Sequence, residues 1–420
     1  MRYLISGVRG VAVCALLSGA RVALAAPTFS FEAGASLAPP GFTGLRSDSL
    51  ALGDLDGDGD LDLVNAGGPT VPTAVFVNDG LGVFTPGFVM DAGVYESTAI
   101  ADLDGDHRPD VVRGSYQTGT LAVWRNVGDG TFTRITLAGM GEPRSLDAGD
   151  VDGDGDVDLV TGGRRVLRND GTGTFTRLAA FDTDTASFQT QLVDLDADGD
   201  LDAVINQPAG VRQAGYLIYR NDGLGGFTFL TALSGSRDGF DAAFGDLDGD
   251  GDVDVVGATG PTTSRVWLND GHAAFTGGPT FTPGAHVRYE ALDYDRDGDP
   301  DVYVAGAPAA SSLWRNDGGA LTAVDLGVSG SLFAAAGDVN GDGLPDVVQG
   351  NGCAGCAGTA PTRVWINTSD TDGDGIPDRD DLCPAADASA ADVDADGALD
   401  DLDGDGVLDD ADLCPLVPDP

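Results

Sequence analysis

The chain contains 420 residues, of which 68 are acidic and 22 are basic, and its formal net charge at pH 7 is −46. Nucleic acids and anionic membranes are bound through basic patches, so this charge excludes both as partners. The length allows one large β domain together with smaller segments.

The first 25 residues are typical of a secretory signal peptide. Arg2 and Arg9 supply positive charge, Val11 to Leu17 form a short apolar run, and Ala23-Leu24-Ala25 offers small residues for cleavage. Arg21 departs from the pattern because it places a charge in the cleavage region. The apolar run is too short to cross a bilayer, and no later segment qualifies. We therefore expect a secreted or surface-displayed chain that does not insert into the membrane.

A nine-residue pattern, Asp-x-Asp-x-Asp-Gly-x-x-Asp, occurs seven times at intervals of 44 to 52 residues. Internal repeats of this length are typical of propeller blades. The copies begin at Asp54, Asp102, Asp150, Asp194, Asp246, Asp293 and Asp338. Two copies depart from the pattern. His107 replaces the glycine of the second copy, and Asn340 replaces the second aspartate of the seventh.

This spacing is that of a calcium-binding loop. The acids at positions 1, 3 and 5 converge on one point, a carbonyl at position 7 and an acid at position 9 complete the oxygen shell, and glycine at position 6 permits the turn. Without a cation, these carboxylates would repel one another. We expect the loop with His107 to be weakened or redirected, whereas Asn340 still offers an oxygen.

We therefore expect about seven Ca²⁺ ions, one in each loop. The predicted ligand positions are Asp54, Asp56, Asp58, Asp60 and Asp62; Asp102, Asp104, Asp106 and Asp110; Asp150, Asp152, Asp154, Asp156 and Asp158; Asp194, Asp196, Asp198, Asp200 and Asp202; Asp246, Asp248, Asp250, Asp252 and Asp254; Asp293, Asp295, Asp297, Asp299 and Asp301; and Asp338, Asn340, Asp342, Leu344 and Asp346.

Each repeat also predicts four short strands. A strand of small residues precedes the loop, an apolar strand follows it, and a third strand ends in asparagine. Asp-Gly follows this asparagine in most repeats, which is a strong turn signal before a fourth strand. The four tryptophans lie two residues before the asparagine, at Trp124, Trp267, Trp314 and Trp365. This regular placement favours packing between neighbouring blades over stacking on a sugar.

The seventh repeat stops at Asn367 without a fourth strand. Residues 28–31, Thr-Phe-Ser-Phe, resemble the fourth strands of other repeats. We therefore predict that the N-terminal strand completes the last blade and closes the ring, which removes exposed sheet edges. The predicted fold is all-β: a seven-bladed β-propeller of four-stranded blades over residues 26–367, with a small, loop-rich C-terminal tail organised by calcium.

The tail, residues 368–420, carries three more copies of the acidic pattern, so we expect about three further Ca²⁺ ions there. The predicted ligands are Asp370, Asp372, Asp374, Asp378, Asp392, Asp394, Asp396, Asp400, Asp401, Asp403, Asp405 and Asp409. Four cysteines follow the signal peptide, an even number that favours disulfides in a secreted chain. Of three possible pairings, Cys353–Cys356 with Cys383–Cys414 is the most economical; a redox or zinc role for Cys353-x-x-Cys356 is the alternative.

The recurring loop, turn and strand pattern resembles the FG-GAP/VCBS repeat family, whose blades also occur in integrin α-subunits. The resemblance implies calcium in the turn between strands one and two, and partners bound by the opposite face or rim. The tail is similar to thrombospondin type 3 repeats, because Asp381-Leu-Cys383-Pro384 and Asp412-Leu-Cys414-Pro415 follow its acidic segments. This second resemblance implies a calcium-dependent stalk.

The face opposite the calcium loops varies most between repeats, which makes it the expected binding face. It carries Tyr95, Glu96, Tyr116, Glu142, Arg144, Arg237, Phe240, Arg288, Tyr289 and the loop of Cys353 and Cys356. Most of these are expected to be ordinary rim residues.

Three functions are consistent with these features. The first is a monomeric, non-catalytic binding or adhesion module for an extracellular protein or glycan. The second is a structural spacer of a cell-surface assembly. The third is a calcium-dependent polysaccharide lyase or hydrolase, although no nucleophile elbow, zinc-spaced histidines or phosphate loop is found. Of the three histidines, His286 alone falls on the expected binding face.

Overall fold

A computed structural model describes residues 31–37, 47–67, 72–93, 95–115, 117–128, 130–138, 143–162, 165–178, 181, 189–207, 215–235, 241–284, 288–306, 310–324, 326, 331, 333–350 and 362–369. The predicted signal peptide, the predicted tail from residue 370 onward and every cysteine lie outside these residues. The chain divides into two compact units, residues 33–366 and residues 1–32 with 367–420. The described part of the chain holds no helix with the length and apolarity needed to span a membrane.

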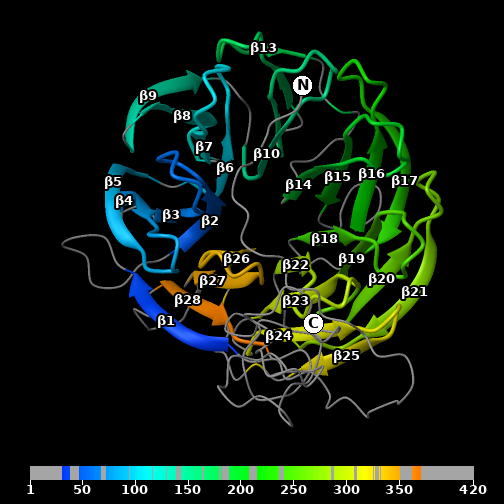
Figure 1. Ribbon diagram of the computed structural model, residues 1–420. Helices are drawn as coiled ribbons and strands as arrows, with labels where there is room; N and C mark the ends of the chain where they lie inside the picture. The colour runs from blue at the N-terminus through cyan, green and yellow to red at the C-terminus, as the bar shows by residue number, and fades with distance from the viewer. Residues whose placement is uncertain are drawn as a thin grey trace, which may run out of the picture. The chain divides into compact units, whose positions relative to one another are not determined.

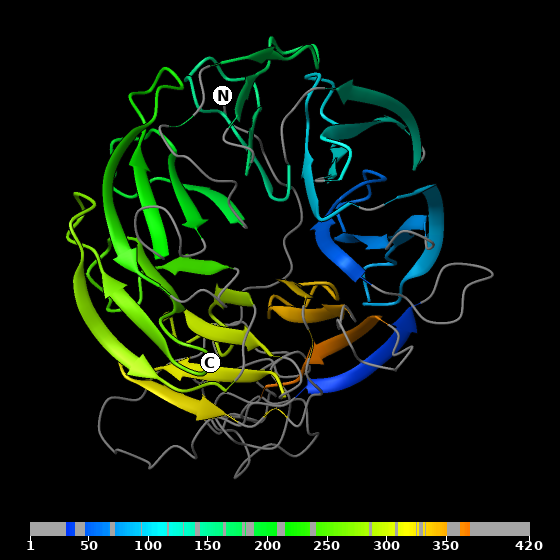
Figure 2. The same cartoon turned by 180° about the vertical axis from the view of Figure 1, so that it is seen from behind.

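Seven four-stranded sheets form a ring, so the predicted all-β, seven-bladed propeller is confirmed (Figures 1 and 2). Within each blade, strands adjacent in sequence pair side by side. The strands of the first four blades are β2 (Ser47–Gly53), β3 (Asp62–Gly67), β4 (Pro72–Val77) and β5 (Thr85–Ala92); β6 (Ser97–Ala101), β7 (Asp110–Ser115), β8 (Thr120–Gly128) and β9 (Thr131–Ala138); β10 (Leu146–Gly149), β11 (Asp158–Thr161), β12 (Arg165–Arg168) and β13 (Thr176–Arg177); and β14 (Gln189–Val193), β15 (Asp202–Gln207), β16 (Gly215–Arg220) and β17 (Thr228–Ser234).

The fifth blade comprises β18 (Ala242–Gly245), β19 (Asp254–Ala258), β20 (Ser264–Leu268) and β21 (Thr276–Phe281), and the sixth comprises β22 (Arg288–Leu292), β23 (Asp301–Ala305), β24 (Ser312–Asn316) and β25 (Leu321–Val324). The seventh combines β26 (Phe333–Gly337), β27 (Asp346–Gly350) and β28 (Thr362–Asn367) with β1 (Phe31–Leu37) from the N-terminal end. The N-terminal strand therefore completes the last blade, as predicted. It covers Phe31–Leu37, whereas residues 28–30 of the predicted strand lie outside the described residues.

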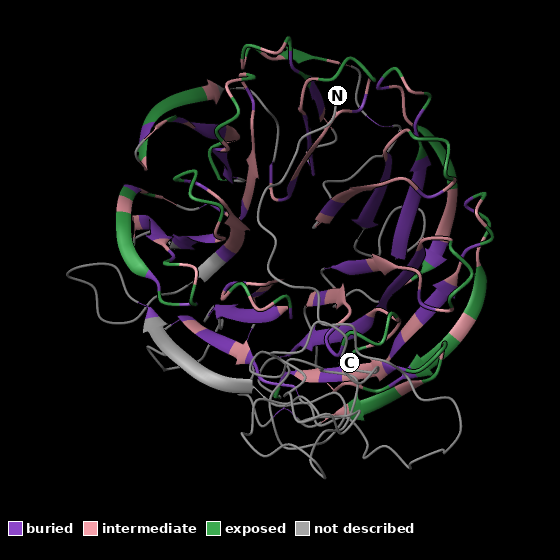
Figure 3. Cartoon of the chain, viewed as in Figure 1, coloured by how far each residue is buried: buried purple, intermediate pink, exposed green. Residues whose placement is uncertain are grey.

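Apolar clusters between consecutive blades hold the ring together. The second strand of each blade is buried, for example throughout β7 and β19, whereas outermost strands such as β5 are largely exposed (Figure 3). Phe76 of β4 shares a cluster with Val348 and Val364 of the last blade, so the first and last blades pack as neighbours. Burying this apolar surface is the main force that closes the ring.

Three of the four tryptophans pack between blades, as predicted. Trp124 is buried, and its ring centroid lies 5.8 Å from that of Phe88 in the preceding blade. Trp267 lies 5.6 Å from Tyr216 and Trp314 lies 4.7 Å from Phe281, again across a blade boundary. These T-shaped or tilted contacts add to the stability gained from burial.

Candidate metal centres

Each acidic loop joins the first strand of a blade to the second, and its first aspartate caps the turn. In the first loop, Asp54 Oδ1 accepts a hydrogen bond from the Gly57 N–H at 2.7 Å, and Oδ2 accepts one from the Gly59 N–H at 3.1 Å. Position 1 accepts the position-6 N–H in all seven loops, at 2.8 to 3.1 Å. The loop is therefore preorganised by its own carboxylate.

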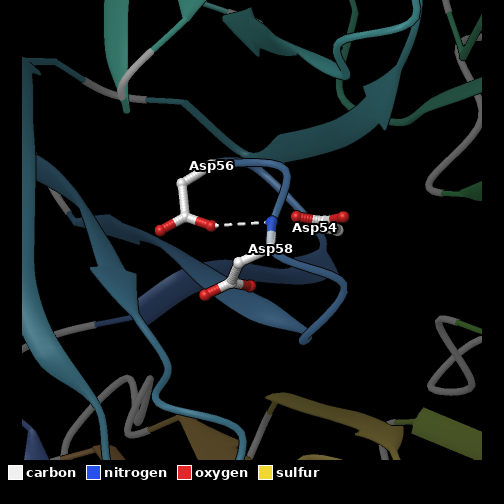
Figure 4. Close-up of side chains that lie close together, drawn as sticks. All are labelled: Asp54, Asp56 and Asp58. Carbon is white, nitrogen blue, oxygen red and sulfur yellow. Dashed lines mark hydrogen bonds between the residues drawn. The ribbon is translucent and has the colours of Figure 1, made fainter.

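The acids at positions 1, 3 and 5 converge as predicted. Ligand-capable oxygens of Asp54, Asp56 and Asp58 all lie within 4.8 Å of one another, and Figure 4 shows these side chains around the turn. Equivalent triplets form in the second, fourth and fifth loops. In the third loop the triplet comprises Asp150, Asp152 and the position-9 residue Asp158.

The turn needs left-handed backbone at two positions, of which the sequence pattern identified one. Position 6 has φ between 66° and 102°, and position 4 has φ between 56° and 86°. His107 occupies position 6 with φ 66°, and its N–H still donates to Asp102 Oδ2 at 2.8 Å. The second loop therefore keeps the same turn despite the missing glycine. The sequence pattern did not predict the positive φ at position 4, because Ala197 and Arg296 replace the glycine there in two loops.

The aspartate at position 9 is buried and fastens the loop to the third strand. Asp62 is 0% exposed; its Oδ2 accepts the Leu55 N–H and its Oδ1 accepts the Asn78 N–H, both at 2.9 Å. Burial is the largest cause that raises the pKa of Asp62 to about 6, while these two N–H donors act to lower it. Burial raises the pKa of Asp301 further, to about 8. Position 9 therefore has a structural role besides its predicted role as a ligand.

The asparagine that ends the third strand links neighbouring loops. Asn126 Nδ2 donates to the carbonyl oxygen of Pro109 in its own loop at 3.1 Å and to that of Leu55 in the preceding loop at 2.7 Å. The same pair of bonds is made by Asn78, Asn169, Asn221, Asn269 and Asn316. The sequence marked this asparagine only as a turn residue.

Position 7 directs its side chain toward the following hairpin turn. A Cβ atom added to Gly80 would lie 2.3 Å from Asp60 Oδ2, so the two turns are in close contact, and the φ of 75° at Gly80 favours glycine there. In the sixth blade, Asp299 Oδ2 accepts the Gly318 N–H at 2.7 Å. This geometry agrees with a main-chain rather than a side-chain ligand at position 7.

The loops fit a hard cation such as Ca²⁺. They offer only oxygen donors, and several of those oxygens are buried without a hydrogen-bond donor, which is costly for a charged group. The Oδ1 atoms concerned belong to Asp104, Asp152, Asp194, Asp196, Asp248 and Asp293. A bound cation would satisfy these atoms and offset the repulsion between the carboxylates.

Arginines lie against four of the loops, and the sequence analysis did not identify them. In these blades the residue before the asparagine is an arginine whose guanidinium contacts the position-3 carboxylate. The distances are 2.9 Å for Arg125–Asp104, 2.5 Å for Arg168–Asp152, 2.7 Å for Arg220–Asp196 and 3.4 Å for Arg315–Asp295. Arg168 and Arg220 also reach the position-5 carboxylates Asp154 and Asp198, at 3.2 and 3.0 Å.

A polar pocket of about 330 Å³ opens where the innermost strands β10, β14, β18 and β22 begin, at their ends remote from the loops. Arg288 Nη1 lies 3.3 Å from Asp241 Oδ2 within it. Burial is the largest cause that raises the pKa of Glu290 to about 8 and that of Asp147 to about 6. The pocket combines one cation with several acids, so it suits a polar ligand.

The expected binding face is corrected at two positions. Tyr95 and Tyr289 are buried rather than displayed: the Arg113 guanidinium lies 3.7 Å from the Tyr95 ring centroid, and the Tyr289 hydroxyl lies 2.7 Å from Ser264 Oγ. Arg288 lines the polar pocket, and Glu96 and Arg144 are half-buried. Tyr116, Glu142, Arg237, Phe240, His286 and the loop of Cys353 and Cys356 lie outside the described residues.

A family model for the FG-GAP-like repeat matches residues 54–113, 102–161, 209–257 and 293–348, together about half of the chain. The chain belongs to the FG-GAP-like repeat family. The matched segments include six of the seven acidic loops or parts of them, so family membership and loop geometry agree. A comparison with curated proteins found no match.

Solved structures share the propeller fold. The crystal structure of BBS1N in complex with ARL6DN, soaked with mercury, is 10% identical, covers 80% of this chain and 96% of that chain, and has a TM-score of 0.55; the lead-soaked crystal has a TM-score of 0.53 at the same identity and coverage. A lectin of Agrocybe aegerita, described as recognising non-reducing terminal N-acetylglucosamine, is 21% identical over 74% of this chain and 87% of that chain, with a TM-score of 0.48. At 10% identity the likeness to the two BBS1N structures concerns the fold alone.

Proposed function

We propose that this FG-GAP-like propeller is a secreted, calcium-binding, non-catalytic binding module for an extracellular protein or glycan. The observation that carries the proposal is the convergence of the carboxylates at positions 1, 3 and 5, with buried oxygens that have no donor. Calcium would supply the missing positive charge and lock each strand-connecting loop. The bound ions would therefore stabilise the ring, and we assign partner binding to the face opposite the acidic loops.

Calcium binding is tested by thermal unfolding in millimolar Ca²⁺ and in EDTA. Extracellular modules bind Ca²⁺ at roughly 10⁻⁴ to 10⁻³ M, and a site at ten times its Kd adds roughly 1.4 kcal/mol of stability. Seven such sites would add roughly 10 kcal/mol, so we expect EDTA to lower Tm by more than about 10 °C. An unchanged Tm would rule out a role for calcium in stabilising the ring.

Ligand binding is assigned to the polar pocket at the remote ends of the innermost strands. The Arg288–Asp241 pair and Glu290 present both a cation and acids to a hydroxyl-rich or amide-rich ligand. Arrays of glycans and of extracellular proteins, probed with and without EDTA, test this assignment. We expect Arg288→Ala to abolish a specific signal, and Arg177→Ala, on the exposed β13, to leave it intact. Equal loss in both variants would exclude the pocket.

Secretion and the calcium-dependent tail are part of the same proposal. The sequence pattern of residues 1–25 supports export, and the acidic segments of residues 370–420 support a thrombospondin type 3-like stalk. N-terminal sequencing of exported protein should begin close to residue 26. Limited proteolysis should cut residues 370–420 faster in EDTA than in Ca²⁺; equal rates would contradict a calcium-organised tail.

A further inference from the structure

The first and fifth loops differ from the arginine-bound loops in the residue that precedes the asparagine. The residue before the asparagine is Val77 in the first blade and Leu268 in the fifth, so neither places a guanidinium on the loop. The seventh blade has Ile366 there, but Asn340 reduces the charge of its loop and Arg296 donates to the Asp342 carbonyl oxygen, so it belongs to neither group.

The third and fifth loops form a natural matched pair. Residues 150–158 and 246–254 are identical except at position 2, where Val151 and Leu247 are both buried. Both loops cap their turns with the same bonds, since Gly155 and Gly251 each donate to the first aspartate at 2.9 Å. The local difference in charge is therefore Arg168 in the third blade against Leu268 in the fifth.

The first blade shows the space that an arginine would take. Beside its loop lies a groove of about 600 Å³ lined by Asp56, Asp58, Val77 and Phe88 among others. In the third and fourth blades, the corresponding carboxylates at positions 3 and 5 are both contacted by Arg168 or Arg220. Valine carries no group that could pair with these carboxylates, so Asp56 and Asp58 line the groove without an arginine from this position.

The arginine and a calcium ion share carboxylates: each guanidinium contacts Oδ2 of the position-3 aspartate, whereas Oδ1 of Asp104, Asp152 and Asp196 has no donor and can face the ion. On calcium binding, the guanidinium must either leave the position-3 carboxylate or remain beside the ion as a like charge, and both outcomes reduce calcium affinity. Without calcium, the guanidinium offsets the repulsion between these acids and stabilises the loop. One side chain therefore has opposite effects on calcium affinity and on metal-free stability.

We infer that Arg125, Arg168, Arg220 and Arg315 are built-in counter-cations that divide six of the seven loops into two calcium-affinity classes. The first and fifth loops are the high-affinity sites, and the four arginine-bound loops fill only at higher calcium concentration. The ring thus stays closed at low calcium through its arginines. This inference rests on the proposed calcium binding and specifies which loops respond to a change in calcium.

The decisive variant is Arg168→Leu, which gives the third blade the residue of the fifth. Calcium titration of the full chain by calorimetry should show one more high-affinity site, with an affinity gain of about tenfold. The Tm in EDTA should fall. Arg177→Leu removes the same charge from the same blade away from the loop, and should change neither quantity. Arg168 is 48% exposed, so its replacement opens no cavity.

Val77→Arg is the reverse variant, because the groove beside the first loop has room for the longer side chain. It should remove one high-affinity site and raise the Tm in EDTA. If calcium binds but neither variant changes the distribution of sites, the affinity classes are refuted while calcium binding stands. If the unmodified chain binds no calcium, the proposed function and this inference both fail. A lower Tm of Arg168→Leu without a gain in affinity would show a purely structural role.

Discussion

The side-chain amide of Asn78 donates to the main-chain carbonyl oxygen of Val339 at 2.6 Å, although 261 positions separate the two residues. Asn78 directly follows the third strand of the first blade, and Val339 is the second residue of the last of the seven propeller loops. The same bond joins each of the next five blades to the loop before it. Since a carbonyl of one loop is held by the asparagine of the next blade, these bonds connect the loops in series across six of the seven blade boundaries.

Replacing one of these asparagines should weaken the whole ring. Asn169→Ala would leave the carbonyl oxygens of Leu103 and Val157 without their donor, at a cost of about 2–4 kcal/mol for two buried groups. Urea unfolding in Ca²⁺ and in EDTA measures the loss, which should appear in both. Thr174→Ala, an exposed change in the same blade, is the control. Equal midpoints for the two variants would contradict the role of the asparagine.

The acids of one loop should separate into structural and calcium-dependent groups. Asp254 is buried and accepts the Leu247 and Asn269 N–H groups at 3.0 and 2.8 Å, whereas Asp250 is exposed and accepts only the Asp252 N–H among the bonds described. Asp254→Ala should therefore lower stability by about 2–4 kcal/mol even in EDTA. Asp250→Ala should mainly reduce the gain on adding Ca²⁺.

Thermal unfolding of both variants with and without Ca²⁺ provides the measurement. A wild-type Tm for Asp254→Ala in EDTA would show that position 9 acts only as a ligand. A large decrease in the Tm of Asp250→Ala in EDTA would show that position 5 also has a structural role that does not depend on calcium.

The repeat architecture could be predicted from the sequence because the same short-range signals recur seven times. Loop, asparagine and turn lie within about 30 residues of one another, so errors in one copy are corrected by the others. The N-terminal strand could be placed because its alternating Phe pattern matches a strand that the last repeat lacks.

What the sequence missed depends on contacts between blades or between distant turns. The sequence does not predict the hydrogen bond from the Asn126 amide to the Leu55 carbonyl oxygen, nor the ion pair between Arg168 and Asp152. Tyr95 was expected on the rim, but it is buried against Arg113, a charged residue with 0% exposure in β7. Periodicity cannot reveal such a pair, because it does not show which polar side chains find partners inside the core.

Relieving the left-handed backbone in the fourth loop should stabilise the chain. Ala197 has φ 56° at position 4, where most loops have glycine, so Ala197→Gly should gain about 0.5–1 kcal/mol. His107→Gly, at φ 66°, should behave likewise and leave calcium binding by the second loop unchanged. Ala99→Gly in β6 is the control, since glycine in a regular strand costs about 0.5–1 kcal/mol. A loss of stability in Ala197→Gly, measured by urea unfolding, would contradict this account.

The metal-free ring should lose stability as pH rises from 5 to 8. Burial raises the pKa of Asp62, Asp110, Asp158, Asp202 and Asp254 to about 6 and that of Asp301 to about 8. An unfolded aspartate has a pKa of about 3.9, so the folded ring binds these protons more tightly. The stability that these bound protons contribute to the folded ring is fully present below about pH 4. It is lost as pH rises through about 6, and for Asp301 through about 8.

Calcium should reverse this trend, because it replaces the protons that the loops release. We therefore expect the Tm in EDTA to fall between pH 5 and pH 8, and the rise in Tm on adding Ca²⁺ to grow over the same range. Scans at constant ionic strength, repeated in 0.5 M salt, separate this effect from general repulsion in a chain of charge −46, because salt screens exposed charges more than buried ones. A metal-free Tm that rises steadily from pH 5 to pH 8 would show that the buried aspartates are ionised without cost.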